Sequence, residues 1–205
     1  MNIYEHEQVA IKLEELYNTY KDEDLSKYSI DEVKKIHAAM KHRTYYHKYF
    51  KIFYFKPLEW HRKFFKMGST ERMRASISAN RTGKSYGGAF EFACHALGWY
   101  PNWWDGVRFN KESYPDEANS LAMMLLGVDF NQMAKPQAIL ELIFGDSNNR
   151  GCGFIPKDFI SSIENKAGYK SIPGRVYIKH SGGDNTLIDI NTYSQGQDVL
   201  MGAIY

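Results

Sequence analysis

The chain has 205 residues, 43% of them hydrophobic, which is enough to bury a core and suits one main domain with an extension. Its 26 basic and 24 acidic residues nearly cancel, so overall charge does not indicate a nucleic-acid-binding protein. The two cysteines lie far apart, which excludes a disulfide scaffold and favours a reduced cytosolic protein. Charges occur throughout the first residues, and no apolar run approaches about 18 residues, so we expect no signal peptide and no membrane span.

Two helices are predicted at the N-terminal end of the chain. Apolar residues recur every three or four positions over Val9–Tyr20, which is typical of an amphipathic helix. Ser29 and Glu32 form a capping-box pattern that predicts the start of a second helix. We therefore expect a helical appendage over residues 1–50, followed by the main domain over residues 51–205.

The stretch Lys41–Lys66 is locally basic, with eight lysine and arginine residues against one acid, Glu59, and many aromatic residues between them. Cations beside aromatic rings suit phosphates and stacked bases, as in nucleic-acid binding. The same pattern is also typical of an aromatic core edge whose lysines reach out to water. Both interpretations remain open.

The remaining pattern alternates strands and helices. A short, partly apolar run is predicted to be a strand, and a Gly-Lys-Ser loop and a helix follow it. A second, fully buried strand leads into a helix that carries Pro136 in its first turn. Two further strands flank a glycine-rich link and predict a hairpin. The expected strands are Met73–Ser78, Leu121–Val128, Arg175–His180 and Thr186–Tyr193, and the expected helices are Tyr86–Leu97 and Gln132–Phe144. This order predicts an α/β fold with a mainly parallel sheet flanked by helices.

The loop Ser78–Ser85 (SANRTGKS) has the pattern of a phosphate-binding loop. Backbone N–H groups before a helix cradle phosphates, the lysine reaches the β- and γ-phosphates, and the hydroxyl binds Mg²⁺. Lys84 and Ser85 would fill these two roles, while Gly83 permits close backbone approach. The strict pattern places glycine at the first position, where this chain has Ser78.

Charged residues near the loop have several interpretations. Arg81 could contact the γ-phosphate, or it could face solvent. Glu91 shares a helix face with Lys84, and we favour a structural role for it. Asp129 closes an apolar run, as a metal-binding acid would, although no second acid follows it. The histidines lack the spacing of metal ligands, so no zinc site is expected.

The sequence that follows the loop resembles the ATPase segment of the large terminase subunits of tailed bacteriophages. The resemblance extends roughly from Lys56 to Tyr205. It rests on Asn80, Gly83-Lys84-Ser85, Gly88-Ala89-Phe90-Glu91, His95–Pro101 and Trp104–Phe109, and further on Gly153–Ile160 and Thr192–Ala203.

This resemblance implies a P-loop NTPase fold that uses ATP and Mg²⁺. It implies catalytic roles for Lys84 and Arg81 and a metal role for Ser85. The segment Pro57–Phe65 resembles the family's adenine site, with His61 where glutamine is usual and Arg62 beside it. The ATP-binding residues implied are Ser78, Ala79, Asn80, Arg81, Thr82, Gly83, Lys84, Ser85, His61 and Arg62.

The same resemblance implies a motor that packages viral double-stranded DNA and cuts it. Its implied partners are duplex DNA, the portal, the small terminase subunit and other copies on the capsid, with no membrane, in the cytoplasm of the bacterial host. The family's acidic pair would begin just after Ala203, and its nuclease domain would follow. We therefore expect a fragment that binds ATP weakly and hydrolyses it poorly.

Two alternatives come from other functional classes. One is a P-loop phosphotransferase in which Asp129 is the metal acid. The other is a non-catalytic DNA-binding module, in which the basic aromatic stretch contacts DNA and the loop is vestigial.

Overall fold

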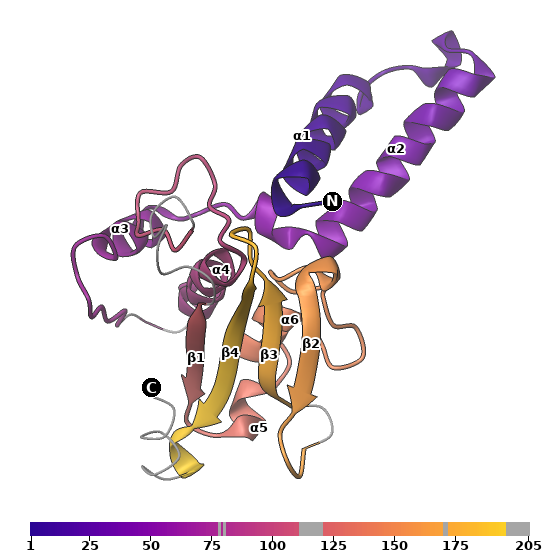
Figure 1. Cartoon of the computed structure of the whole chain (residues 1–205). Coiled ribbons are helices and arrows are strands. Elements are labelled where there is room, and N and C mark those ends of the chain that lie inside the picture. Colours follow the sequence, from indigo (N-terminus) through magenta and orange to yellow (C-terminus); the bar gives the residue numbers. More distant parts are fainter. Residues whose placement is uncertain (78, 80, 111–120, 170–171, 196–205) are drawn as a thin grey trace.

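The computed structural model describes residues 1–77, 79, 81–110, 121–169 and 172–195. Its described part combines a four-stranded sheet and flanking helices, so the fold is mixed α/β. A helical hairpin projects from this body (Figure 1).

The hairpin consists of α1 (Ile3–Tyr20) and α2 (Ile30–Tyr49), which a short 3-10 turn, η1 (Leu25–Lys27), connects. Both predicted helices are therefore confirmed, although α1 begins earlier than expected. The capping box is also confirmed, because the Ser29 hydroxyl accepts from the Glu32 N–H and the Glu32 carboxylate accepts from the Ser29 N–H. Local sequence chemistry thus fixes where α2 begins.

The base of the hairpin contacts the body through polar groups of α1. The indole N–H of Trp99 donates to the Glu7 carboxylate at 2.9 Å. His6 is buried, and its Nε2 atom lies 3.7 Å from the Asp158 carboxylate. These contacts attach the hairpin to the body, and a domain boundary at residue 50 remains a prediction.

The segment after the hairpin contains η2 (Lys51–Tyr54), α3 (Glu59–Met67) and α4 (Lys84–Leu97). The predicted helix over Tyr86–Leu97 is confirmed as the greater part of α4. An aromatic cluster joins these elements, with Phe55 stacked on Phe90 at 3.8 Å between ring centroids. The core of the body is therefore centred on α4.

The sheet has the strand order β1-β4-β3-β2. Figure 1 shows α5 and α6 behind it. The remaining elements, in chain order, are β1 (Ala122–Gly127), α5 (Phe130–Met133), α6 (Ile139–Phe144), η3 (Lys157–Phe159), β2 (Ile160–Asn165), β3 (Pro173–Lys179), β4 (Asn185–Thr192) and η4 (Tyr193–Gln195).

The prediction of a mainly parallel sheet is wrong. Only β1 and β4 pair in parallel, whereas β4 with β3 and β3 with β2 pair in antiparallel fashion. Short connections cause this, because a parallel pair needs a crossover of a dozen or more residues and an antiparallel pair needs only a turn. The predicted hairpin of the last two strands is confirmed as β3 and β4.

The prediction of a strand over Met73–Ser78 is also wrong for the described residues, because Met73–Ile77 has no regular structure. Both end side chains of that segment are more than 90% exposed. The segment is tied to helices instead, since Arg74 donates to Glu91 of α4 at 2.9 Å and to the Phe64 carbonyl at 2.8 Å. This ion pair bears out the structural role expected for Glu91.

Two other expectations need correction near β1. The strand is not fully buried, because it lies at the edge of the described sheet and its residues are only partly covered. The helix expected over Gln132–Phe144 is divided into α5 and α6. Pro136 lies between them, as does Gln137, whose φ of 61° is left-handed, so the backbone cannot continue as one helix.

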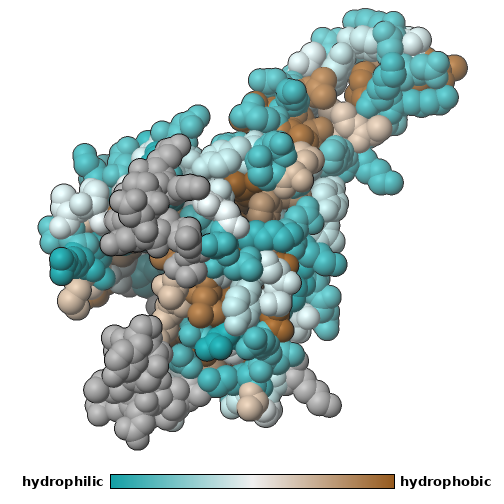
Figure 2. Space-filling view, in the orientation of Figure 1, coloured by the Kyte–Doolittle hydropathy of each residue, from teal (hydrophilic) through white to brown (hydrophobic). Residues whose placement is uncertain are grey.

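Alternating residues of the two inner strands bury one face of the sheet, among them Val176, Ile178, Ile188 and Ile190. The buried Thr186 hydroxyl of β4 donates to the Ala96 carbonyl at 2.7 Å, so the start of β4 is fixed to the end of α4. Much of the visible surface is hydrophilic, with apolar side chains gathered between α1 and α2 and along the body (Figure 2).

Replacing Phe90 with alanine tests the aromatic core. Phe90 has no exposed surface, so Phe90→Ala should lower the free energy of unfolding by about 3–5 kcal/mol. Ile30 is 76% exposed, and Ile30→Ala should change the free energy of unfolding by no more than about 0.5 kcal/mol. Urea unfolding followed by circular dichroism measures both, and equal effects of the two changes would contradict the assigned core.

Candidate functional site

The loop before α4 is closed on itself by contacts to one carbonyl. Arg81 and Gly83 have left-handed φ angles of 63° and 84°, which turn the chain sharply into the helix. The Thr82 hydroxyl donates to the Ala79 carbonyl at 3.0 Å, and the Lys84 ammonium donates to the same oxygen at 2.6 Å. The loop therefore holds Lys84 beside its own backbone.

His61 of α3 holds this loop in place through a hydrogen bond. Its Nδ1 atom accepts from the Leu58 N–H at 3.0 Å, so the proton of the neutral ring lies on Nε2. Nε2 then donates to the Gly83 carbonyl at 3.2 Å. Burial lowers the pKa of His61, which favours the neutral form that makes both bonds. His61 thus connects the start of α3 to the start of α4.

The contact depends on the absence of a side chain at Gly87. A Cβ atom at Gly87 would lie 2.5 Å from the imidazole Cδ2 of His61, which is closer than atoms can pack. At Gly88 a Cβ atom would have no neighbour within 4 Å. A side chain is therefore excluded at Gly87 and has room at Gly88.

A cavity of about 480 Å³ opens at the loop. Its walls are Arg81 to Tyr86, together with Gln137 and Leu142, which follow the carboxyl end of β1. The N-cap residue of α4 is Gly83, which has no side chain with which to cap the helix. Two cationic side chains and the positive end of a helix suit an anionic ligand.

The structure brings most of the predicted phosphate-binding residues together. Arg81, Thr82, Gly83, Lys84 and Ser85 all line the cavity, and Ala79 supplies the carbonyl that Lys84 contacts. Ser78 and Asn80 lie outside the described residues.

The two residues expected at an adenine site have other contacts. His61 is only 2% exposed and both of its ring nitrogens are engaged, which is at odds with a hydrogen bond to a base edge. The Arg62 guanidinium lies 5.1 Å above the Trp103 ring, and its role in ATP binding remains a prediction.

Ser85 is exposed on the first turn of α4, where its hydroxyl is accessible to an ion held by phosphate oxygens. The described residues contain no cluster of three or more histidine, cysteine, aspartate or glutamate side chains that could hold a metal. Mg²⁺ bound through a hydroxyl, phosphate oxygens and water fits this donor set.

Asp129 has a structural contact in the described fold. Its carboxylate accepts from the Gln132 N–H at 2.8 Å and caps α5. It does not line the cavity beside Lys84. This geometry does not favour the phosphotransferase in which Asp129 holds the metal.

The basic aromatic stretch has ion pairs at two of its eight basic side chains. Arg43 forms a two-bond ion pair with Glu14 of α1, and Lys63 pairs with Glu59 at 2.7 Å. Its aromatic residues supply core side chains such as Phe55 and Phe65. These contacts favour the interpretation of the stretch as a core edge.

Sequence reasoning missed three residues of the cavity wall, Tyr86, Gln137 and Leu142. Tyr86 could have been identified from the sequence, because it directly follows the phosphate-binding loop pattern. Gln137 and Leu142 come from a distant segment, and only the break at Pro136 marks it in the sequence.

Within the described residues, none of the helices combines the length and apolar character needed to cross a bilayer. Comparisons of the chain with protein-family models, curated proteins and solved structures found no match. The interpretation of the site therefore depends on its own residues and on the sequence resemblance.

The glycine pair before Ala89 gives a matched test of the His61 support. Gly87→Ala forces His61 from the Gly83 carbonyl and should destabilise the fold by about 1–3 kcal/mol. Gly88→Ala meets open space and should stabilise α4 by about 0.5–1 kcal/mol. Thermal and urea unfolding measure both, and similar behaviour of the two variants would refute the packing described for His61.

Stability should also fall in mild acid. Burial lowers the pKa values of His6, His61 and His180 in the folded chain. In the unfolded chain these rings have a pKa of about 6.5 and take up protons first, so the free energy of unfolding falls as the pH drops below 6.5. Urea unfolding at pH 7.5 and 5.5 tests this above the range where carboxylates titrate, and equal stability at both pH values would contradict it.

Proposed function

We propose that the loop before α4 binds the phosphates of ATP with Mg²⁺. The observation that carries this proposal is the cavity at the start of α4, where Lys84, Arg81 and the first turn of the helix face the same space. The loop sequence supplies the residue types that phosphate binding uses at these positions. A volume of about 480 Å³ lies within the range of small-molecule sites.

In this proposal each polar residue of the loop has one role. The Lys84 ammonium exchanges the Ala79 carbonyl for oxygens of the β- and γ-phosphates. The backbone N–H groups at the start of α4 bind phosphate oxygens, and Ser85 contributes its hydroxyl to Mg²⁺. Arg81 adds positive charge near the terminal phosphate. The left-handed turns at Arg81 and Gly83 favour this role because they shape the loop before any ligand arrives.

We further propose that the chain is the ATP-binding part of a terminase large subunit, the motor that packages viral double-stranded DNA. The support is the sequence resemblance over Asn80 to Phe109, which continues beyond the phosphate loop. The proposal includes the family's P-loop fold, its partners (duplex DNA, portal, small terminase subunit and further copies on the capsid) and its place in the cytoplasm of the host. ATP hydrolysis and DNA cutting are activities of the complete motor.

Replacing Lys84 with alanine tests the phosphate site. The change removes a charged hydrogen-bond donor, whose loss costs about 1.5–3 kcal/mol, so ATP affinity should fall by about ten- to a hundredfold. Lys12 is exposed on α1, and Lys12→Ala should leave ATP affinity unchanged. Titration calorimetry with Mg-ATP on the full chain measures both. An unchanged affinity in Lys84→Ala, or no ATP binding by the parent chain, would rule out the proposed site.

A further inference from the structure

A second cavity adjoins the phosphate cavity and shares three of its walls, Tyr86, Gln137 and Leu142. Its volume is about 160 Å³. A cavity of about 150 Å³ accommodates benzene, so this space has room for an aromatic ring. The shared walls make the two cavities neighbouring parts of one cleft.

Two aromatic rings form one side of the second cavity. The Tyr86 and Phe154 centroids are 4.9 Å apart with planes tilted by 56°. Phe154 is only 2% exposed and is therefore fixed by the core, whereas Tyr86 is 43% exposed and presents part of its ring to a ligand. Because Tyr86 is on the first turn of α4, a ring that stacks on it lies directly beside the phosphate-binding N–H groups.

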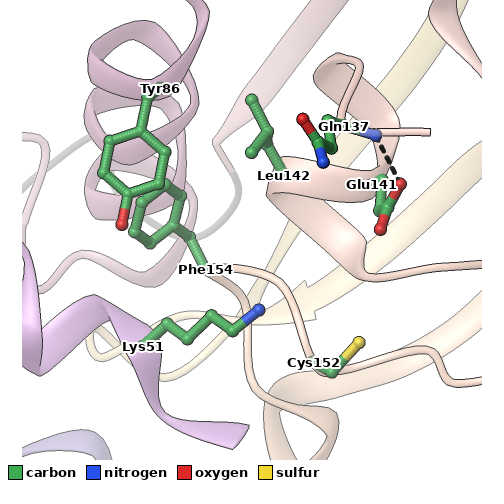
Figure 3. Close-up of a pocket in the computed structure, with 7 residues that line it drawn as sticks. All are labelled: Lys51, Tyr86, Gln137, Glu141, Leu142, Cys152 and Phe154. Atoms are coloured by element: carbon green, nitrogen blue, oxygen red, sulfur yellow. Dashed lines mark hydrogen bonds between the residues drawn. The ribbon is translucent and has the colours of Figure 1, made fainter. Parts of the chain in front are cut away.

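Polar groups enter the cavity from two opposite sides. Figure 3 shows Gln137 and Glu141 on one side and the Lys51 side chain reaching in from the other. The Gln137 N–H donates to the Glu141 carboxylate at 2.6 Å, and this bond helps to hold the left-handed backbone at Gln137. Such strained backbone is concentrated at functional sites. The cavity thus presents a carboxylate, an amide and an ammonium around an aromatic wall.

On the side of the loop that faces α3, His61 occupies the space beside the backbone. There the His61 ring is covered, and its nitrogens bond to the Leu58 N–H and the Gly83 carbonyl. A base that entered on this side would have to break the contact that supports the loop. The open, aromatic flank is the one that Tyr86 and Phe154 form.

We propose that the second cavity holds the base of the nucleotide whose phosphates occupy the loop. The base stacks on the Tyr86 ring, and a purine with an exocyclic amino group donates to Glu141 or to the Gln137 carbonyl oxygen. Lys51 donates to the ring nitrogens on the other edge. This inference rests on the proposed function of the loop and assigns the base to the cavity beside Tyr86 and Phe154 instead of the segment around His61.

The test compares binding of Mg-ATP with binding of inorganic tripolyphosphate, which has the phosphates without the base. Titration calorimetry on the full chain gives the ratio of the two affinities for each variant. Tyr86→Ala and Lys51→Ala should each lower the ratio of ATP to tripolyphosphate affinity, by about tenfold for the stacking residue. Tyr86→Phe keeps the ring and should restore the parental ratio. Lys48→Ala removes a nearby exposed lysine and serves as the charge control.

The outcomes separate this inference from the function of the loop. If Lys84→Ala does not weaken tripolyphosphate binding, both proposals fail. If Lys84→Ala weakens it but neither Tyr86→Ala nor Lys51→Ala changes the ratio, the base is held elsewhere and only this inference fails. A ratio that falls in Arg62→Ala and not in Tyr86→Ala would place the base on the α3 side. Melting temperatures confirm that each variant is folded.

Discussion

The geometry of the loop and cavity before α4 depends on the His61 imidazole. With its Nδ1 atom it accepts the N–H that begins α3, and with Nε2 it donates to the carbonyl of Gly83, the residue that caps α4. A neutral ring is needed for both bonds, and burial provides the environment that keeps it neutral. One side chain therefore fixes two helix starts and the turn between loop and helix. The partly buried Arg74–Glu91 pair ties the preceding segment to the same helix.

The elements that the sequence predicted well are those fixed by local chemistry. The start of α2 follows from Ser29 and Glu32, and α4 begins directly after the glycine turn of the Gly-Lys-Ser motif. The prediction of a mainly parallel sheet was wrong because the direction of each strand depends on the connection that leads to it. No strand was predicted at the position of β2. The strand expected at Met73–Ser78 was wrong over its described residues, because a strand needs a partner edge and apolar composition alone cannot supply one.

The candidate site was predictable as far as it is contiguous. Arg81 to Ser85 could be identified because five adjacent residues carry the pattern. The anchoring role of His61 could not, since it requires knowing that a residue 22 positions earlier lies under Gly83. Gln137 is further still along the chain, and its place in the wall follows from the left-handed turn after Pro136. The positions of His61 and Gln137 depend on contacts between distant segments of the chain, which the motif does not predict.

Because Gly87 has no side chain, the substitutions that are tolerated at position 87 depend on the residue at position 61. While an imidazole lies against this helix turn, a methyl group at position 87 has no room, so neither position can drift alone. A lineage that replaced His61 with a smaller residue would release the constraint on Gly87, and one that gained a side chain at 87 would first have to lose the ring. Positions 61 and 87 should therefore covary, whereas Gly88, beside open space, is free to vary without a compensating change.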